Sequence, residues 1–295
     1  MPGYSVQTLE ACEASLSGWC DTQQSGAQTD LSGAARCAVE TALLDLTGHQ
    51  RGLPAHALLG SAIAHSVPLS ALLLSETVDG VLAEAERAVG RGVFTLKLKV
   101  GSPGLFNAEL RRLHALRDRF GNRIALRLDA NGAFSLKDAP TRLAALAELK
   151  PEFIEEPVAR QDLLALGPSP IPIALDESLQ GGWEEALVES VAVAVLKPMI
   201  LGGPQTCVAL AARLIDAGLR LTVSHTWDGP IGLAAAAATA LAIGARWPSR
   251  LLACGLERHP GLAAWPSVDL PFLEAGELVP SARPGLGLSA FELGA

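Results

Sequence analysis

From residue 66 to residue 255 the chain alternates between two hydrophobic patterns. Short runs rich in Leu, Val and Ile, typical of buried strands, are followed by longer segments in which apolar residues recur every three or four positions, typical of helices. Segments 104–120 and 204–219 combine helix start signals with a period of about 3.6 residues. The predicted strands cover residues 66–74, 93–100, 123–131, 152–157, 171–178, 191–198, 219–226 and 250–255.

Eight strands with seven intervening helices favour a parallel barrel, because parallel neighbours need crossover connections. The competing architecture, an open doubly wound sheet, would be expected to carry a glycine-rich phosphate loop after an early strand, and neither GxGxxG nor GxxxxGK[ST] occurs. We therefore predict an α/β fold of the TIM-barrel type, (β/α)7β.

The two ends of the chain lack this alternation. Before residue 66 one strong helix is predicted at 34–47, followed by a loop and a short helix. The residues after Gly255 are rich in Pro and Gly and non-periodic, and we expect them to wrap back over the first segment. The predicted organisation is an N-terminal domain at 1–65, a barrel carrying the active site at 66–256 and a returning tail at 257–295.

Charged residues stand late in otherwise apolar strands, where a barrel places its catalytic groups. Counted from Lys99, the steps to the next charged strand ends are 30, 26, 21 and 21 residues, each close to one strand–helix unit. Three carboxylates and three lysines are thus predicted on one rim. The residues concerned are Lys97, Lys99, Asp129 with Asn131, Glu155 with Glu156, Asp176 with Glu177, and Lys197.

Taken singly, each of these residues has an ordinary structural interpretation. An Asp at a strand end is more often a helix cap than a ligand, and KxK is often a solvated strand face. Together they favour a functional site, because burying six unpaired charges would cost several kcal/mol each. Three oxygen ligands from separate rigid strands suit Mg²⁺, which keeps further positions for water or substrate.

Composition narrows the partners and the compartment. A net charge of −8 with scattered Lys and Arg argues against a nucleic-acid surface and an anionic membrane. Five cysteines without metal-type spacing, and no export signal at the N-terminus, predict a reducing cytoplasm. The apolar stretch 231–245 is too short and alanine-rich to span a bilayer and is expected to be a buried helix. The expected partner is a small carboxylate; the sequence leaves the oligomeric state open.

Five ordered motifs resemble those of the enolase superfamily, muconate-lactonizing subgroup. They are TLKLKVG, LRLDANGAFS, FIEEPV, IALDESL and LKPMILGG, and AARCAVETALLDLTGHQRGLPAHALLG resembles the end of that family's capping domain. The resemblance implies a modified TIM barrel with an N-terminal α+β capping domain and an enzyme that uses Mg²⁺, for which Mn²⁺ is a substitute. Only about 65 residues precede the first barrel strand. The cap is therefore expected to be shortened, and substrate selection is the property most affected.

The same resemblance assigns roles to the rim. It implies Asp129, Glu155 and Asp176 as metal ligands, with Asn131, Glu156 and Glu177 as partners of ligands or lysines. The catalytic residues would be Lys99 as acid/base, Lys97 near the metal and the substrate carboxylate, and Lys197 opposite. A lysine base needs a pKa lowered from ~10.4 to ~7–8, and we expect neighbouring cations and partial burial to lower it. With the metal, such a base would form an enediolate.

Within the subgroup, the motifs look most like o-succinylbenzoate synthases of menaquinone biosynthesis. These carbon–oxygen lyases perform a syn dehydration of 2-succinyl-6-hydroxy-2,4-cyclohexadiene-1-carboxylate. Dipeptide epimerases tend to carry Asp-x-Asp at the eighth strand for the substrate ammonium, and ACGLE lacks it. Backbone N–H groups near Gly202, Gly203 and Ser224 are predicted to receive the succinyl carboxylate, although the glycines could equally serve a tight turn.

Several alternatives remain open at this stage. Racemisation of N-succinylamino acids, dipeptide epimerisation and muconate-type cycloisomerisation share the proton-abstraction step, and both lysines that a racemase needs are present. His225 and Asp228, on the loop after the seventh strand, are more simply a structural histidine and a helix cap. A non-catalytic barrel used as a scaffold is disfavoured, because a decaying site would lose its charged rim first.

Overall fold

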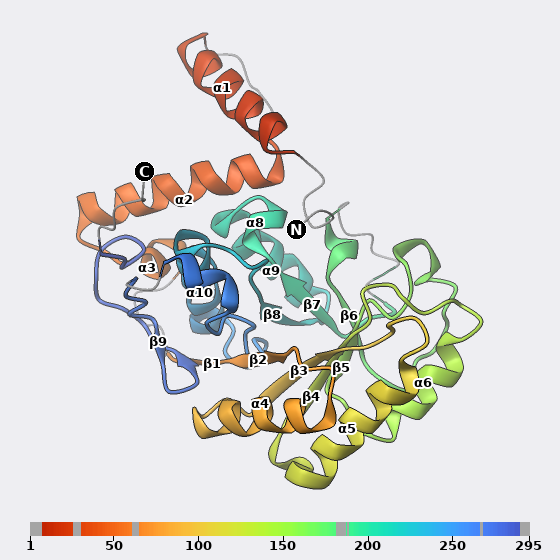
Figure 1. Ribbon diagram of the computed structural model, residues 1–295. Coiled ribbons are helices and arrows are strands. Elements are labelled where there is room, and N and C mark those ends of the chain that lie inside the picture. Colours follow the sequence, from red (N-terminus) through yellow and green to blue (C-terminus); the bar gives the residue numbers. More distant parts are fainter. Residues whose placement is uncertain are drawn as a thin grey trace.

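Seven parallel strands, neighbours in space in the order of the sequence, form a curved sheet in the computed structural model (Figure 1). The structure describes residues 8–25, 31–60, 65–180, 187, 189–265 and 268–289. Each strand lies inside a predicted run. They are β2 (Ser70–Leu73), β3 (Thr95–Lys99), β4 (Ala125–Asp129), β5 (Phe153–Glu155), β6 (Ile173–Leu175), β7 (Val193–Leu196) and β8 (Arg220–Val223).

The predicted eighth strand, residues 250–255, closes the barrel as an irregular segment. It forms isolated parallel bridges from Leu251 to β8, from Gly255 to Ser224 just after β8, and from Cys254 to Leu69. The Ala253 carbonyl departs from the ladder because it accepts side-chain hydrogen bonds, from Arg127 Nη1 at 2.6 Å and from Thr222 Oγ1 at 2.8 Å. The barrel is therefore closed partly by buried side chains rather than by a regular strand.

Helices cover the outside of the sheet, and their starts follow from the sequence. Thr77 Oγ1 accepts from the Gly80 N–H at the start of α4, and prolines stand in the first turns of α6, α8, α9 and α10. The helices are α4 (Val78–Gly90), α5 (Phe106–Phe120), α6 (Ala139–Ala147), α8 (Pro198–Leu201), α9 (Pro204–Asp216) and α10 (Pro230–Arg246), with the short turn η1 (Gly121–Arg123). Helix α10 is buried along most of its length, which confirms the prediction for 231–245. No helix of the described residues is long and apolar enough to cross a membrane.

One connection differs from the predicted strand–helix alternation. Between β5 and β6 the chain forms only the 3₁₀ turn η2 (Arg160–Asp162), because Gly167 and the prolines that follow it prevent a longer helix. After β6 a second 3₁₀ turn, η3 (Glu177–Leu179), follows. Residues 181–186 and 188 of the next connection lie outside the described residues.

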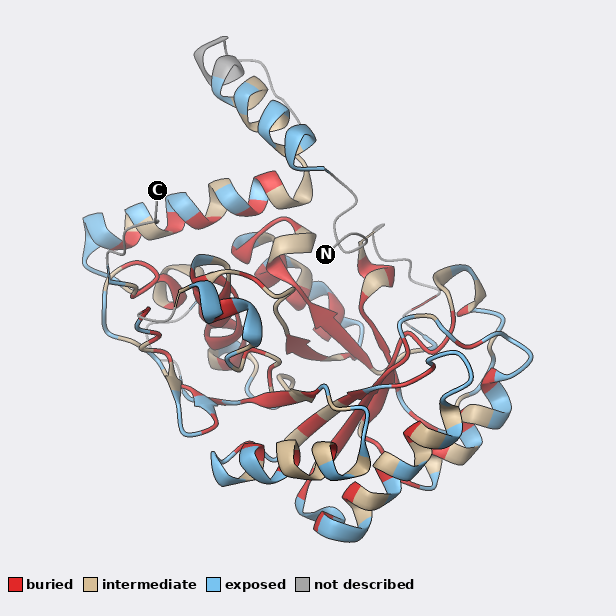
Figure 2. Ribbon diagram, viewed as in Figure 1, coloured by how far each residue is buried: buried red, intermediate tan, exposed pale blue. Residues whose placement is uncertain are grey.

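Two apolar layers hold the barrel together. Leu96, Leu98, Leu126 and Leu128 point outward and are almost completely buried against the helices. A separate inner cluster contains Phe153, Ala174, Val193 and Val195. Figure 2 shows the resulting pattern, with buried strands at the centre and helices whose outer faces are exposed. The alternation along each strand thus sends one face to the helices and the other into the barrel.

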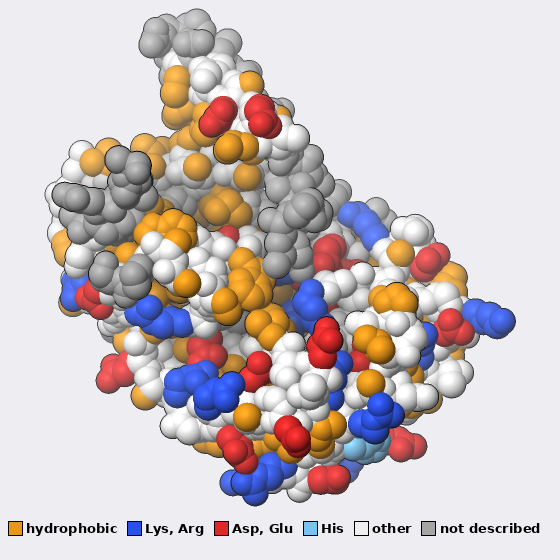
Figure 3. All heavy atoms as spheres, viewed as in Figure 1, with side chains coloured by type: hydrophobic (Ala, Val, Ile, Leu, Met, Phe, Trp, Pro, Cys, Tyr) orange, Lys and Arg blue, Asp and Glu red, His pale blue; other side chains and the backbone are white. Residues whose placement is uncertain are grey.

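A charged residue completes the inner cluster. The guanidinium of Arg127, only 2% exposed, lies 4.7 Å from the Phe153 ring centroid and pairs with Glu152 at 2.7 Å. On the outside, Arg119 of α5 pairs with Glu86 of α4 at 2.8 Å, and Figure 3 shows acidic and basic side chains interspersed over these helices.

The described residues before the barrel are helical. They form α1 (Leu9–Ser25), α2 (Gly33–Arg51), which contains the predicted helix 34–47, and α3 (Ala55–Leu59). Ser32 caps α2 by accepting from the Ala35 N–H. Within residues 8–25 and 31–60 there is no strand, so the β part of the predicted α+β cap is not seen there. Helix α1 projects away from the barrel (Figure 1).

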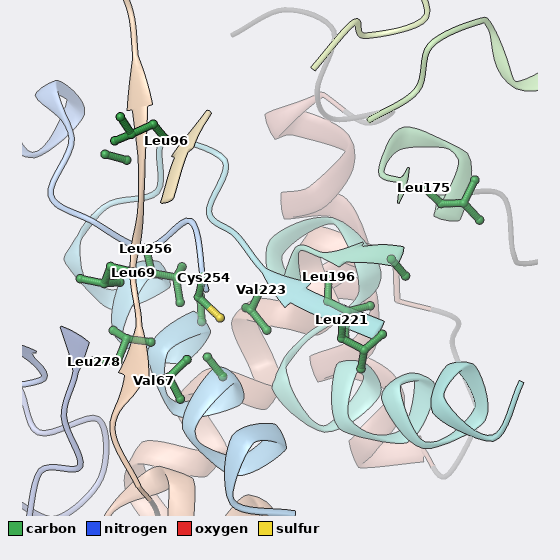
Figure 4. Close-up of a cluster of buried hydrophobic side chains, with 14 of the residues drawn as sticks. Val67, Leu69, Leu96, Leu175, Leu196, Leu221, Val223, Cys254, Leu256 and Leu278 are labelled. Carbon is green, nitrogen blue, oxygen red and sulfur yellow. The ribbon is translucent and has the colours of Figure 1, made fainter. Parts of the chain in front are cut away.

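The C-terminal residues contact the N-terminal helices. Asp45 Oδ1 accepts from the Leu286 N–H at 2.8 Å, and the Ala55 N–H donates to the Gly285 carbonyl at 2.7 Å. The 3₁₀ turn η4 (Pro260–Ala264) precedes β9 (Leu273–Glu274) and β10 (Glu277–Leu278), and these two strands form an antiparallel sheet with β1 (Val67–Pro68). Figure 4 shows Val67, Leu278, Leu69 and Cys254 packed at this junction. The domain boundaries at 65/66 and 256/257 stay predictions.

Helix α2 is fastened to the barrel through one carboxylate. Glu40 accepts from the Gln205 N–H at 3.0 Å and from Thr206 Oγ1 at 2.9 Å, at the start of α9. This approach requires Gly203, whose φ is +119° and whose hypothetical Cβ would lie 2.3 Å from Glu40 Oε2. The second glycine of the pair, Gly202, has a φ of +104° at the end of α8.

We expect Gly203→Ala to destabilise the protein, because alanine adds backbone strain and a collision with Glu40. The strain alone costs about 1–3 kcal/mol, which corresponds to a fall in Tm of several degrees. Gly104→Ala is the matched control, since Gly104 also has positive φ but nothing within 4 Å of its Cβ position. Thermal unfolding should show the larger loss at Gly203, and Glu40→Ala should relieve part of it. Equal losses at the two glycines would contradict the close approach.

Candidate active site

Three buried carboxylates lie side by side at the C-terminal ends of neighbouring strands. Register pairs Lys99 of β3 with Asp129 of β4 and Asp129 with Glu155 of β5, and Asp176 directly follows β6. Asp129, Glu155 and Asp176 are each at most 4% exposed. The parallel strands therefore bring together acids that are 26 and 21 residues apart in the sequence.

Two lysines contact these acids. Lys97 Nζ lies 2.9 Å from Asp129 Oδ2 and 2.5 Å from Glu155 Oε2, and Lys197 Nζ pairs with Asp176 Oδ2. Burial by itself would lower the pKa of Lys97, but the charges of Glu155, Asp129 and Asp176 outweigh it and raise that pKa above its ordinary value. Carboxylates rather than cations are the nearest neighbours of Lys97, so this lysine is held in its charged form.

Lys99 lies on the same face of β3 but takes a different partner. Its Nζ donates to Asn131 Oδ1 at 2.7 Å, and Asn131 Nδ2 donates to Glu177 Oε1 at 2.9 Å. Asn131 also donates its backbone N–H to Asp129 Oδ1 at 3.1 Å, from a left-handed conformation with φ of 43°. The amide thus orients both a rim acid and Lys99, and Lys99 is the exposed lysine at this rim.

Glu156 points away from the rim and supports it from behind. Its Oε1 accepts from the backbone N–H groups of Asp176 at 2.7 Å and Ser178 at 2.9 Å, and its Oε2 accepts from Ser178 Oγ at 2.7 Å. Burial raises the pKa of Glu156, and these hydrogen bonds oppose the rise. The side chain fixes the turn that carries Asp176, which gives a structural basis for choosing Glu155 rather than Glu156 as the acid that faces the site.

The donor set fits a divalent cation. Burial, together with the charges of Asp129 and Asp176, raises the pKa of Glu155 to about 7 despite the opposing charge of Lys97. Glu177 Oε2 is buried without a hydrogen-bond partner in the described part of the chain. An added cation would favour the charged form of Glu155, and all-oxygen ligands suit Mg²⁺. Among the described residues, no three His, Cys, Asp or Glu side chains converge on one point as metal ligands. The ammonium groups of Lys97 and Lys197 contact the rim acids instead.

A cavity opens onto this rim. Among the predicted residues, Lys97, Lys99, Asp129, Lys197 and Ser224 line it. Much of the opposite wall was not predicted from the sequence. It contains Ser70 and Leu72 of β2, Leu74 just after it, Gly255 at the end of the eighth strand segment, and Glu257, Arg258, His259 and Pro260. The one signal available was position, because these residues also follow strand ends.

The predicted anion-binding role of Gly202 and Gly203 is not supported. Neither glycine lines the cavity, and both backbone N–H groups donate to the Pro198 carbonyl, at 3.2 and 2.9 Å. Their positive φ values and the approach of Glu40 account for glycine at both positions. Ser224 does line the cavity, but its N–H donates to the Leu196 carbonyl at 2.9 Å. Its hydroxyl lies 3.3 Å from the Gly255 carbonyl.

Aromatic rings form part of the cavity wall. The rings of His225 and His259 stack with centroids 4.2 Å apart, and Trp227 packs edge-on against His259 at 5.4 Å. His225 Nδ1 accepts from the Trp227 N–H at 3.0 Å, and His259 Nε2 lies 3.0 Å from the Asp228 carbonyl. Burial, with the nearby His259, lowers the pKa of His225 to about 3, so this ring is neutral near pH 7. Asp228 hydrogen-bonds Thr226 just before α10, as a cap-region residue would.

Known proteins share this arrangement of strands. A family model described as "Enolase C-terminal domain-like" matches residues 80–292. The chain belongs to the enolase superfamily. The prediction of an enolase-superfamily enzyme with a modified TIM barrel is confirmed.

Relatives within the superfamily differ in reaction. The hydrophobic dipeptide epimerase of Roseobacter litoralis is 31% identical, over 96% of this chain and 83% of that protein. The N-succinyl-L-Arg/Lys racemase of Bacillus cereus is 26% identical, with 88% and 70% covered. The o-succinylbenzoate synthase of Thermobifida fusca is 36% identical over 180 residues, covering 59% and 55%.

One similar solved structure contains a bound Mg ion. The dipeptide epimerase of Methylococcus capsulatus complexed with a Mg ion is similar with a TM-score of 0.79 and 27% identity, over 98% of this chain and 88% of that one. This similarity covers the barrel and the segments on either side of it. Members of the superfamily bind Mg²⁺, and the carboxylate rim of this chain is compatible with the same ion.

We expect acid to destabilise the protein partly through His225. The ordinary pKa of histidine is 6.5, so below this pH His225 of the unfolded chain binds a proton. In the folded protein the pKa of His225 is about 3, so the ring stays neutral down to about that pH. The free energy of unfolding is therefore unaffected by this proton above pH 6.5. It decreases as the pH falls below 6.5, by about 2 kcal/mol at pH 5. His225→Asn keeps an acceptor for the Trp227 N–H, and Tm measured from pH 7 to 5 should fall less in this variant. The control is His114→Asn on the exposed face of α5, and an unchanged slope in His225→Asn would contradict the assignment.

Proposed function

We propose that this enzyme removes the proton α to a carboxylate and acts as a Mg²⁺-dependent o-succinylbenzoate synthase. The observation that carries the proposal is the placement of Lys99 and Lys197 with the carboxylate rim between them. Lys99 ends β3, Lys197 follows β7, and Asp129, Glu155 and Asp176 occupy the three strands in between. The barrel is formed by β2 to β8 and the segment 250–255, so β3 and β7 lie on opposite sides. A substrate on the rim is thus flanked by one ammonium group on each side.

The chain's own residues account for the proton transfers. Lys99, in its neutral form, takes the α-proton, and the resulting electron pair forms the enediolate. As the ring becomes aromatic, the bond to the leaving hydroxyl breaks and Lys99 returns its proton to that oxygen, so that water departs on the same face. Asn131 holds the Lys99 amine in place through its Oδ1. Lys197 places positive charge on the other face.

The rim would hold the metal. Asp129, Glu155 and Asp176 are the proposed ligands, supported by Asn131 on Asp129 and by Glu156 behind Asp176. Bound Mg²⁺ supplies a Lewis acid that stabilises negative charge on the substrate carboxylate. Lys97, between Asp129 and Glu155, is positioned to keep the rim compensated and to face the same carboxylate.

The wall opposite the rim favours a succinyl-bearing substrate over a free dipeptide. A dipeptide presents an ammonium group, which needs carboxylates on this wall. Among the described residues, the acid that lines this wall is Glu257, and it is paired with Arg91. The wall thus offers Arg258 and neutral rings rather than unpaired acids. A cytoplasmic role in menaquinone biosynthesis follows from this proposal.

Racemisation of N-succinylamino acids is the second candidate. It is supported by the same opposed lysines, because one lysine could remove the α-proton and the other could return one to the opposite face. The similarity to an N-succinyl-L-Arg/Lys racemase across 88% of this chain favours it as well. Both candidates require a substrate with two carboxylates, and they differ in whether Lys197 transfers a proton.

Turnover of 2-succinyl-6-hydroxy-2,4-cyclohexadiene-1-carboxylate, followed by loss of the diene absorbance, tests the proposal. We expect rapid dehydration with Mg²⁺ and none with EDTA. Lys99→Ala should lower kcat at least a thousandfold without changing Tm, and Lys137→Ala, an exposed lysine after β4, should match the wild type. Near-wild-type activity in Lys99→Ala would remove its proposed role. No dehydration combined with Mg²⁺-dependent α-deuterium exchange into N-succinylamino acids would establish the racemase instead.

Glu156→Gln tests the support behind Asp176. An amide presents its NH₂ to donors that now face a carboxylate oxygen, so the turn that carries Asp176 should shift. We expect the Mg²⁺ dissociation constant, measured by calorimetry, to rise by about 10–100-fold. Glu148→Gln, at an exposed position after α6, is the control. Unchanged Mg²⁺ affinity in Glu156→Gln would show that Glu156 does not orient a ligand.

A further inference from the structure

Residues 257 and 258, which follow the barrel-closing segment 250–255, lie between the catalytic cavity and a neighbouring hollow. Glu257 and Arg258 line both spaces. The hollow is otherwise formed by Leu69, by residues 90–92 and by residues 273–276 around the β9–β10 turn. Two adjacent residues of opposite charge thus form a wall of the active site, and their partners decide which charge the substrate meets.

The acidic member of the pair is already neutralised from the hollow side. Arg91 donates to Glu257 Oε1 from Nε at 2.8 Å and from Nη2 at 2.5 Å. Arg91 itself lines the hollow and not the catalytic cavity. This forked contact compensates the charge of Glu257 and holds the carboxylate toward Arg91.

The basic member has no such partner. Arg258 is exposed, and its one hydrogen bond runs from Nη2 to the Val268 carbonyl at a long 3.4 Å. Within the described residues no carboxylate forms an ion pair with it. By contrast, Lys97 and Lys197 pair with rim acids, and Lys99 bonds Asn131. Arg258 is therefore the cationic side chain on this wall whose charge is not compensated by a described acid.

We propose that Arg258 binds the second carboxylate of the substrate, the one remote from the rim. This inference rests on the proposed function, which already requires a substrate with two carboxylates. A guanidinium presents a planar fork of donors that matches a carboxylate, and its weak contact with Val268 leaves most of those donors for a ligand. The Arg91–Glu257 pair acts as a positioning device, because it keeps the adjacent acid from competing for Arg258. Arg258 is thus a determinant of specificity for dicarboxylates, and Lys99 retains the chemistry.

Binding of two matched compounds tests this assignment. The probes are o-succinylbenzoate and 2-butyrylbenzoate, which differ in whether the acyl chain ends in a carboxylate or a methyl group. Dissociation constants are measured by calorimetry with Mg²⁺ present. We expect Arg258→Ala to weaken o-succinylbenzoate binding by about 10–100-fold while changing 2-butyrylbenzoate less than twofold. Arg258→Lys should fall between, since it keeps the charge without the fork.

The control is Arg250→Ala, whose side chain contacts the Gly218 carbonyl before β8 begins. Equal affinity of wild type and Arg258→Ala for o-succinylbenzoate would overturn the inference, as would wild-type protein that binds neither probe or both equally well. Selective loss of affinity without turnover of the diene or α-deuterium exchange would leave the inference standing and remove the proposed function. Normal dehydration with an unchanged KM in Arg258→Ala would remove the inference and leave the proposed function standing.

Discussion

The structure depends on the burial of opposite charges at one end of a parallel barrel. Three carboxylates that are almost fully buried would repel one another and lose hydration, and two lysines from the flanking strands compensate them. Such a cluster is unfavourable unless its members are held by further hydrogen bonds. Asn131 and Glu156 supply these, from left-handed conformations with φ of 43° and 40°. A fold that maintains this strained, charged rim is best understood as one built for chemistry.

The parts around the barrel serve to keep that rim in place. Arg127 lies below the rim. It donates to the Ala253 carbonyl and so joins the inner cluster to the barrel-closing segment 250–255. Glu40 fastens α2 to the start of α9, just after the loop that follows Lys197. Asp45, five residues later on the same helix, holds the C-terminal segment. One N-terminal helix thus ties together both ends of the chain and the wall of the barrel, although the described segment before the barrel contains no strand.

In the proposed function, chemistry and specificity occupy different walls of the same cavity. The rim on β3 to β7 carries acids and lysines that many reactions of the superfamily could use. The wall formed by residues 224–227, 255 and 257–260 carries stacked histidines, Trp227 and Arg258. The relatives of this chain include epimerases, a racemase and a synthase.

The sequence by itself determined the strand order, the spacing of the charged strand ends and the superfamily, because hydrophobic periodicity and one βα unit per charged residue are local properties of the chain. It also indicated that Lys97 and Lys99 share a face. Only the tertiary structure decided that Lys97 pairs with acids while Lys99 bonds Asn131, and that Glu156 supports a backbone turn. It likewise showed that Gly202 and Gly203 make room for Glu40, and that Arg91 removes Glu257 from the cavity. These outcomes join residues from 20 to 166 positions apart, and no local pattern encodes which of several nearby charges a side chain will meet once the barrel closes.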